Sequence, residues 1–128
     1  MMIYTGYYSK IKEYTDAGLR LLSISRTKPG FVKDCVDVPP LFPDEKILWD
    51  YKKGDIDEME YTSKYLTQLD GMGIDKIIKT IQIFGDDVVL LCWESPEKFC
   101  HRHILADYIN RNSDLVVEEF EKKELSLF

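Results

Sequence analysis

Short apolar runs alternate with amphipathic stretches along this chain. Apolar runs at residues 2–5, 19–25 and 88–92 predict strands, because runs of this length between turn residues are typical of buried strands. Residues 8–17 have a helical pattern that ends at Gly18, where a left-handed cap favours glycine. This strand–helix–strand order predicts a parallel pair of strands with a right-handed crossover.

A long loop is predicted after the second strand. Residues 26–44 contain five residues that interrupt helices and strands, which are Pro29, Gly30, Pro39, Pro40 and Pro43. Loops of this length are uncommon in a compact domain and are usually functional or disordered.

A helical insertion follows, between the second and third strands. Asp44 can cap a helix that ends at Gly54, and Asp55 or Asp57 can cap a second helix. Isoleucines at helical spacing predict a third amphipathic helix over residues 74–84.

Two elements complete the predicted fold. Ser95 and Pro96 predict the start of a helix that runs to about Asn110, because a polar cap followed by proline is a common opening. Residues 115–120 form a final strand candidate. We therefore expect one α/β domain over residues 1–128, with a small, mostly parallel, Rossmann-like sheet flanked by helices.

Length and composition fit a globular domain. The chain has 128 residues, of which 45% are hydrophobic, and this is enough to form a core. No apolar run approaches the roughly 20 residues that cross a bilayer, and the first residues lack the pattern of a secretory signal. We expect a cytoplasmic protein without a membrane partner, whose oligomeric state the sequence leaves open.

The charge is uneven along the chain. Residues 1–36 hold six Lys/Arg against three Asp/Glu and carry a charge of +3. Since the net charge of the chain is −6, residues 37–128 carry −9. This acidic balance disfavours non-specific binding of nucleic acid, which depends on basic side chains. Nucleic acid remains an alternative partner, and a local anion site near Arg26 is compatible with the acidic balance.

The three cysteines are predicted to be free thiols. An odd number in a chain of this size, at Cys35, Cys92 and Cys100, argues against a disulfide scaffold and for a reducing compartment. A redox pair of Cys92 with Cys100 stays an alternative. A metal site would need both to converge with His101, perhaps with Glu94, and their spacing is not that of a zinc finger. No metal or cofactor is therefore predicted.

The stretch from Cys92 to His103 carries most of the candidate chemistry. Two thiols, two imidazoles, a guanidinium and the carboxylate of Glu94 fall within twelve positions. They lie where the third strand passes into a helix, which is where open α/β sheets bind ligands. On that helix His101 lies on the inward arc, whereas His103 points the opposite way and is predicted to be a solvated surface side chain.

These motifs resemble those of a known family, domain of unknown function 488. The resemblance rests on Cys92-Trp93-Glu94 and Cys100-His101-Arg102, and upstream on Tyr4-Thr5-Gly6 and Arg26-Thr27-Lys28-Pro29. It spans most of the chain. It implies no established reaction.

The helical middle of the chain also resembles one branch of that family. The similar residues are Tyr51-Lys52-Lys53-Gly54 and Glu60-Tyr61. One departure matters, because many members have Asp-Val-Arg where this chain has Ile24-Ser25-Arg26. A role that rests on that aspartate is not carried over.

Three residues are candidates for catalysis. Cys100 lies early in the predicted helix, where backbone N–H groups and the positive charge of Arg102 favour a thiolate. In a dry site the pKa of Glu94 would rise and the carboxyl could act as general acid or base. His101 is the third candidate. The structural alternatives are a core cysteine, a core histidine and a salt bridge of Arg102 with Glu94.

Six residues are candidates for ligand binding. Arg26 and Arg102 are predicted to hold a phosphate or carboxylate, and the other walls would come from Thr5, Gly6, Cys92 and Trp93. The expected function is an enzyme or binder of a small anionic or nucleotide-like ligand at the C-terminal ends of the strands. Two alternatives stay open: a non-catalytic module that binds a ligand or nucleic acid, and a thiol redox switch.

Overall fold

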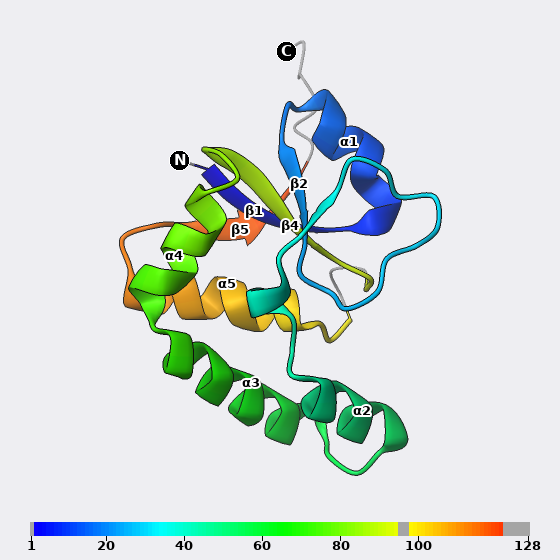
Figure 1. The fold of residues 1–128 in the computed structure, drawn as a ribbon, viewed down its shortest axis with the longest axis vertical. Helices are drawn as coiled ribbons and strands as arrows, with labels where there is room; N and C mark the ends of the chain where they lie inside the picture. The colour runs from blue at the N-terminus through cyan, green and yellow to red at the C-terminus, as the bar shows by residue number, and fades with distance from the viewer. Residues whose placement is uncertain (1, 95–97, 122–128) are drawn as a thin grey trace, which may run out of the picture.

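The fold is an α/β arrangement around a five-stranded parallel sheet (Figure 1). The structure is a computed structural model and describes residues 2–94 and 98–121. The strand order is β3-β2-β4-β1-β5. In sequence the strands are β1 (Met2–Tyr7), β2 (Arg20–Ser23), β3 (Val36–Asp37), β4 (Asp87–Cys92) and β5 (Val117–Glu119). The predicted α/β class is confirmed, and the Rossmann-like comparison stays a prediction.

Helices cover the two faces of the sheet unequally. One face packs against α3 (Glu58–Met72), α4 (Ile74–Gln82) and α5 (His101–Asn112), and these elements form the larger hydrophobic core. The other face is covered by α1 (Ile11–Asp16) and the short 3-10 helix η1 (Tyr8–Lys10), with a smaller core. No helix among the described residues has the length and apolar character needed to cross a membrane.

Strand β4 lies at the centre of the sheet, between β2 and β1. Residues 88–91 are fully buried and alternate between the two cores, Val88 and Leu90 on one face and Val89 and Leu91 on the other. A strand that is apolar on both faces is stable only where helices cover both sides. Because β4 lies between them, β1 and β2 are parallel but do not pair directly. This corrects the prediction that the first two strands form a pair.

The predicted long loop contains one short strand and one helical turn. Strand β3 and the 3-10 helix η2 (Pro39–Leu41) both lie within it, so the helical insertion follows β3 rather than the second strand. The insertion begins with α2 (Glu45–Lys53), which ends at Gly54 in the left-handed conformation (φ 82°), as predicted. Of the two candidate caps for α3, Asp57 is the one used: its Oδ1 accepts from the Glu60 N–H at 2.8 Å.

The insertion is tied to the loop by two side chains of α3, the buried Tyr65 and the half-buried Gln68. The hydroxyl of Tyr65 donates to the Leu41 carbonyl at 2.7 Å, and the amide of Gln68 donates to the Phe42 carbonyl at 2.7 Å. Figure 1 shows α5 between the sheet and α3, with α2 and α3 projecting beyond it. The insertion is therefore held at a fixed place relative to the sheet.

Helix α5 begins later than predicted. It starts at His101 with Cys100 as its N-cap residue, in extended conformation. The predicted opening at Ser95 and Pro96 lies outside the described residues. Phe99 is half-buried against aromatic rings of the insertion and Cys100 is bonded to Cys92, so these side chains hold residues 99 and 100 in a non-helical path.

Candidate functional site

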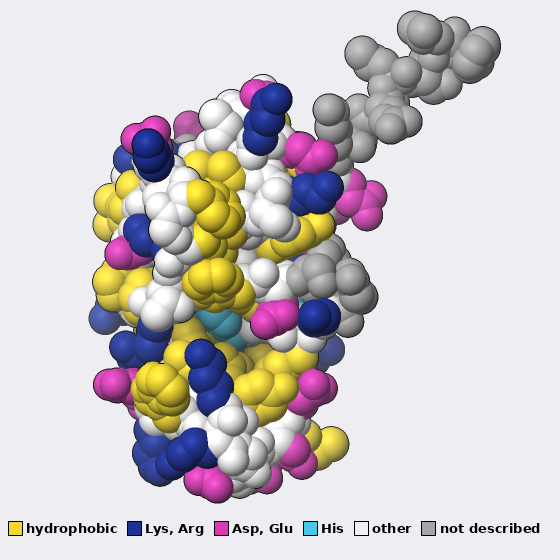
Figure 2. Space-filling view, turned by 90° about the vertical axis from the view of Figure 1, so that its right-hand side faces the viewer, with side chains coloured by type: hydrophobic (Ala, Val, Ile, Leu, Met, Phe, Trp, Pro, Cys, Tyr) yellow, Lys and Arg dark blue, Asp and Glu magenta, His cyan; other side chains and the backbone are white. Residues whose placement is uncertain are grey.

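A cavity of about 490 Å³ opens where β2 and β4 end and α5 begins. Its walls come from three parts of the chain: residues 25–27 and Pro43, the end of β4 with the start of α5, and the insertion. Figure 2 shows this hollow between the sheet-bearing body and the insertion, with a histidine at its bottom and apolar and charged side chains around it. The site thus lies at the C-terminal edge of the sheet, as expected for an α/β fold.

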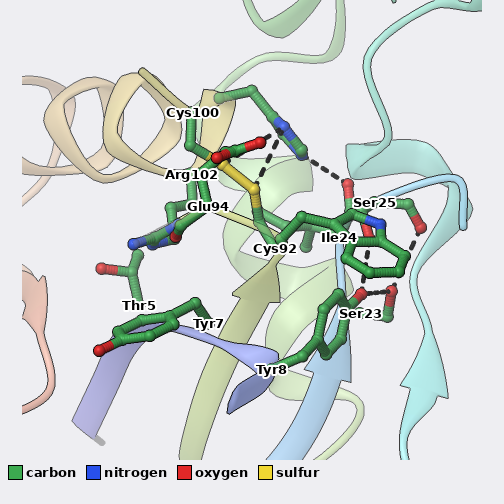
Figure 3. The surroundings of a disulfide bond; sticks show 12 residues. Thr5, Tyr7, Tyr8, Ser23, Ile24, Ser25, Cys92, Glu94, Cys100 and Arg102 are labelled. Atoms are coloured by element: carbon green, nitrogen blue, oxygen red, sulfur yellow. Dashed lines mark hydrogen bonds between the residues drawn. A yellow bond between two sulfur atoms is a disulfide. The ribbon is translucent and has the colours of Figure 1, made fainter. Parts of the chain in front are cut away.

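A disulfide between Cys92 and Cys100 forms the floor of the cavity (Figure 3). The prediction of free thiols is therefore wrong for these two residues. The error arose because they lie on different elements and their distance could not be judged from sequence. Cys35 is a free thiol as predicted, and burial raises its pKa to about 11.

His101 lies against the disulfide and is fully fixed in orientation. Its Nε2 lies 2.6 Å from the Ile24 carbonyl, and a carbonyl only accepts, so Nε2 carries the proton. Its Nδ1 therefore presents a lone pair to Cys92 Sγ at 3.8 Å and to Cys100 Sγ at 4.0 Å. Burial lowers the pKa of His101 to about 4, so the ring is neutral near neutral pH.

Arg102 lies outside the cavity and is engaged in a buried ion pair. Its side chain is 0% exposed, and its Nε and Nη2 donate to the Glu119 carboxylate at 3.0 and 2.9 Å. Its Nη1 donates to the backbone carbonyl of Glu94 at 2.6 Å. The structural alternative of a salt bridge is thus correct in kind, but the partner carboxylate is Glu119 and not Glu94.

Glu119 reaches Arg102 because β5 lies beside β1. Thr5 is in register with Glu119, and its hydroxyl donates to Glu119 Oε1 at 2.7 Å. Burial raises the pKa of the Glu119 carboxyl, but the hydrogen bonds from Arg102 and Thr5 outweigh burial and lower it overall. In Figure 3, Thr5 and Arg102 lie on one side of the disulfide and the cavity residue Ser25 on the other.

Gly6 is covered by an aromatic ring rather than open to a ligand. A Cβ atom there would lie 2.5 Å from the ring and hydroxyl of Tyr14, which is far inside van der Waals contact. The Tyr14 hydroxyl accepts from the Tyr7 N–H at 3.0 Å, so glycine is needed for the ring to reach the strand backbone. Thr5, Gly6 and Arg102 are thus the three predicted site residues that do not line the cavity.

The loop after β2 supplies the opposite wall. Arg26 lines the cavity, and its Nε donates to the Pro43 carbonyl at 2.9 Å. The indole N–H of Trp93 lies 2.9 Å from the Thr27 carbonyl and 3.0 Å from the Thr27 hydroxyl, which fixes the ring at the rim. Glu94 lines the same cavity and is exposed.

A chain of buried hydroxyl groups lies at the end of β2. The Tyr8 hydroxyl lies 2.6 Å from Ser23 Oγ and 2.5 Å from Ser25 Oγ, and the Ser25 hydroxyl donates to the Thr27 carbonyl at 2.6 Å. Burial raises the pKa of Tyr8. This edge of the site is therefore neutral, and neither Tyr8 nor Ser23 stood out in the sequence as part of it.

Sequence reasoning also missed the wall that the insertion supplies. Its cavity-lining residues are Leu48, Tyr51, Lys52 and Tyr61, joined by Phe99. The Tyr51, Tyr61 and Phe99 rings pack with centroids 5.1 to 5.4 Å apart. The resemblance quoted at Tyr51-Lys52 and Tyr61 was the one available signal for this wall.

His103 is not the solvated surface side chain that the sequence predicts. Its ring is half-buried, and within residues 2–94 and 98–121 its shielded Nε2 has no hydrogen-bond partner. Burial lowers the pKa of His103, and Arg102 acts in the same direction. The side chain does not line the cavity, so it stays outside the candidate site.

Comparison with known proteins identifies the family. Residues 3–113 match the DUF488-N3a family, described as the active DUF488-N3 subclade. Neither the search of curated proteins nor the search of solved structures finds a match. The match covers both motifs of the cavity floor and the insertion. This chain therefore belongs to the DUF488 family, as its two motifs predict.

Proposed function

We propose that this chain is an enzyme that acts on a small anionic or nucleotide-like ligand. The observation that carries this proposal is that one cavity joins two cationic side chains, Arg26 and Lys52, to the sulfur and imidazole groups of its floor. Its volume of about 490 Å³ lies within the roughly 300–1,000 Å³ that is typical of small-molecule sites.

The cationic wall favours an anion. Arg26 is oriented through its Nε by the Pro43 carbonyl, which leaves the terminal amino groups of the guanidinium for a phosphate or carboxylate. Among the described residues, neither Arg26 nor Lys52 forms an ion pair with a carboxylate. Both charges are therefore suited to a ligand, although the protein as a whole is acidic.

The aromatic walls favour a planar group attached to that anion. Trp93 is 48% exposed and held at the rim, and the rings of Tyr51 and Phe99 line the opposite side. Stacking of a base on an aromatic side chain stabilises a complex by about 1–3 kcal/mol. A nucleotide-like molecule satisfies both the cationic and the aromatic walls.

Glu94, Cys100 and His101 are the proposed reacting groups. The neutral ring of His101 presents Nδ1 4.0 Å from Cys100 Sγ, so in the reduced protein it can accept a hydrogen bond from the Cys100 thiol and orient the sulfur in the cavity. Glu94 lines the same cavity and can act as a general acid or base. The word "active" in the description of the matched subclade supports an enzyme over a non-catalytic binder.

Calorimetric titration with adenosine monophosphate, adenosine and inorganic phosphate tests the anion site. We expect the nucleotide to bind more tightly than adenosine, and Arg26→Ala to weaken its binding at least about tenfold, because a charge-assisted hydrogen bond contributes about 1.5–3 kcal/mol. Arg20→Ala is the control, since Arg20 is exposed at the start of β2, the opposite end of that strand. Equal binding of adenosine and the nucleotide, or no effect of Arg26→Ala, would contradict the proposal.

A thiol redox switch is the second candidate, and the bonded pair Cys92–Cys100 favours it. Both sulfurs line the cavity, so their reduction changes its floor. We expect iodoacetamide, added to protein unfolded in denaturant, to modify three cysteines after reduction and only Cys35 before it, and nucleotide affinity of the folded protein to differ between the two forms. Equal affinity in both forms would show that the disulfide does not switch binding.

A further inference from the structure

Three potential metal ligands meet on the floor of the cavity. They are Cys92 Sγ at the end of β4, Cys100 Sγ at the N-cap of α5 and His101 Nδ1, and all three atoms lie within 4.8 Å of one another. All three residues are buried. Thiolate and imidazole are the ligands that zinc prefers in proteins.

His101 already has the tautomer and orientation of a metal ligand. Its Nε2–H donates to the Ile24 carbonyl at 2.6 Å, so its Nδ1 lone pair is directed at the two sulfurs (Figure 3). Histidines that bind metals commonly donate their other ring N–H to a backbone carbonyl, which fixes the ring. This hydrogen bond joins two segments 77 residues apart and does not depend on the metal.

The backbone positions of the two cysteines suit a bridging ion. Their Cα atoms lie 7.2 Å apart, whereas directly bonded cysteines usually have Cα atoms roughly 4.4–6.8 Å apart. Two thiolates on a tetrahedral zinc ion, each at about 2.3 Å from it, have sulfurs about 3.8 Å apart. A bound ion therefore requires no closer approach of β4 and α5 than the structure has.

The cavity leaves room for a fourth ligand. Cys92, Cys100 and His101 all line it, so an ion on these three residues would face the bound molecule. Three protein ligands with one open position are typical of catalytic zinc sites, whereas structural sites have four protein ligands. The carboxylate of Glu94 lies on the same cavity wall and can exchange a proton with a molecule at that position.

We propose that the reduced protein binds one Zn²⁺ through Cys92, Cys100 and His101, with the fourth coordination position open to the cavity. A dithiol reductant gives two electrons and two protons to the Cys92–Cys100 bond and leaves as its own disulfide. Zinc then displaces the two thiol protons as two Zn–S bonds form. The oxidised form and the zinc form are mutually exclusive, so reduction controls the site.

This inference goes beyond the proposed function, because metal binding needs no organic ligand. In the zinc form, Cys100 is a metal ligand rather than a nucleophile, and the metal would activate the group bound at its fourth position. The anion site at Arg26 and Lys52 is the same in both cases. Failure of nucleotide binding therefore leaves the metal proposal intact, and the reverse also holds.

Elemental analysis tests the site directly. The protein is reduced with dithiothreitol, freed of it without air, incubated with zinc chloride and passed through a desalting column. We expect about one zinc ion per chain in the reduced protein and none in the oxidised protein. Cys92→Ser and Cys100→Ser should lose the ion, whereas Cys35→Ser should keep it, because Cys35 lies outside the cluster.

Cobalt(II) gives a second measurement that needs no variant. Co²⁺ bound to the reduced protein should show the thiolate-to-metal charge-transfer absorption of sulfur ligands, and zinc should remove it. The absence of this absorption in the reduced protein, or the absence of retained zinc, would overturn the proposal. Retention of zinc by both Cys92→Ser and Cys100→Ser would also overturn it, since the ion would then lie elsewhere.

Discussion

Replacing Arg102 with methionine should lower the free energy of unfolding by about 3 kcal/mol, the lower end of the loss for a broken buried ion pair. Arg102 is fully buried, and Glu119 is 19% exposed in its side chain. The substitution leaves the Glu119 carboxylate without its two strongest donors and the Glu94 carbonyl without its partner. Guanidinium denaturation at pH 7, followed by tryptophan fluorescence, measures the change.

The same helix offers a matched control. Arg111 pairs with Asp107 at 3.0 Å, but the two side chains are 77% and 58% exposed, so Arg111→Met should cost only about 0.3–0.5 kcal/mol. The double variant Arg102→Met with Glu119→Met should recover part of the loss, because no buried charge then lacks a partner. A stable Arg102→Met protein that has lost nucleotide binding would instead place Arg102 in the ligand site.

Acidification from pH 7 to pH 5 should destabilise the oxidised protein by about 2 kcal/mol through His101 alone. The cause is burial, which lowers the pKa of His101 from 6.5 to about 4. The unfolded chain takes up a proton near pH 6.5 and the folded protein does so only near pH 4. The unfolded state therefore binds more protons in this window, and stability falls as the pH falls through it.

Denaturation curves at several pH values measure this slope. His101→Gln has no ionisable ring at this position, so its stability should change less between pH 7 and pH 5 than that of the natural sequence. His103→Gln is the matched control, since it should keep most of the slope while His101 remains. An unchanged slope in His101→Gln would mean that the imidazole titrates with an ordinary pKa in the folded protein.

The elements of this fold could be predicted largely from the sequence, because their signals are local. Gly18 and Gly54 end helices in the left-handed conformation, and Asp57 caps α3 through a contact three residues away. The order of the strands depends on long-range packing instead. Because β4 is buried on both faces, it takes the central place between β1 and β2, which chain order does not indicate.

The part of the candidate site that could be predicted consists mostly of residues that lie close together in the sequence. Six predicted residues line the cavity: Arg26, Cys92, Trp93, Glu94, Cys100 and His101. Arg102 follows directly in sequence, yet its side chain turns to Glu119. That contact depends on the pairing of β5 with β1. Glu119 lies 17 residues from Arg102 and 114 residues from Thr5 in sequence. The wall from the insertion was missed for the same reason, since its contacts with the sheet end are not local.

Under the proposed function, the helical insertion supplies selectivity and the floor of the cavity supplies reactivity. Helices α2 and α3 contribute Leu48, Tyr51, Lys52 and Tyr61 to the cavity, whereas the sulfur and imidazole atoms come from β4 and the start of α5. The insertion is attached to the loop through a few hydrogen bonds from Tyr65 and Gln68. Under that function, substitutions on α2 and α3 would change which molecule fits while the chemistry of the floor is retained, so relatives with a different insertion would be expected to share a reaction but not a substrate.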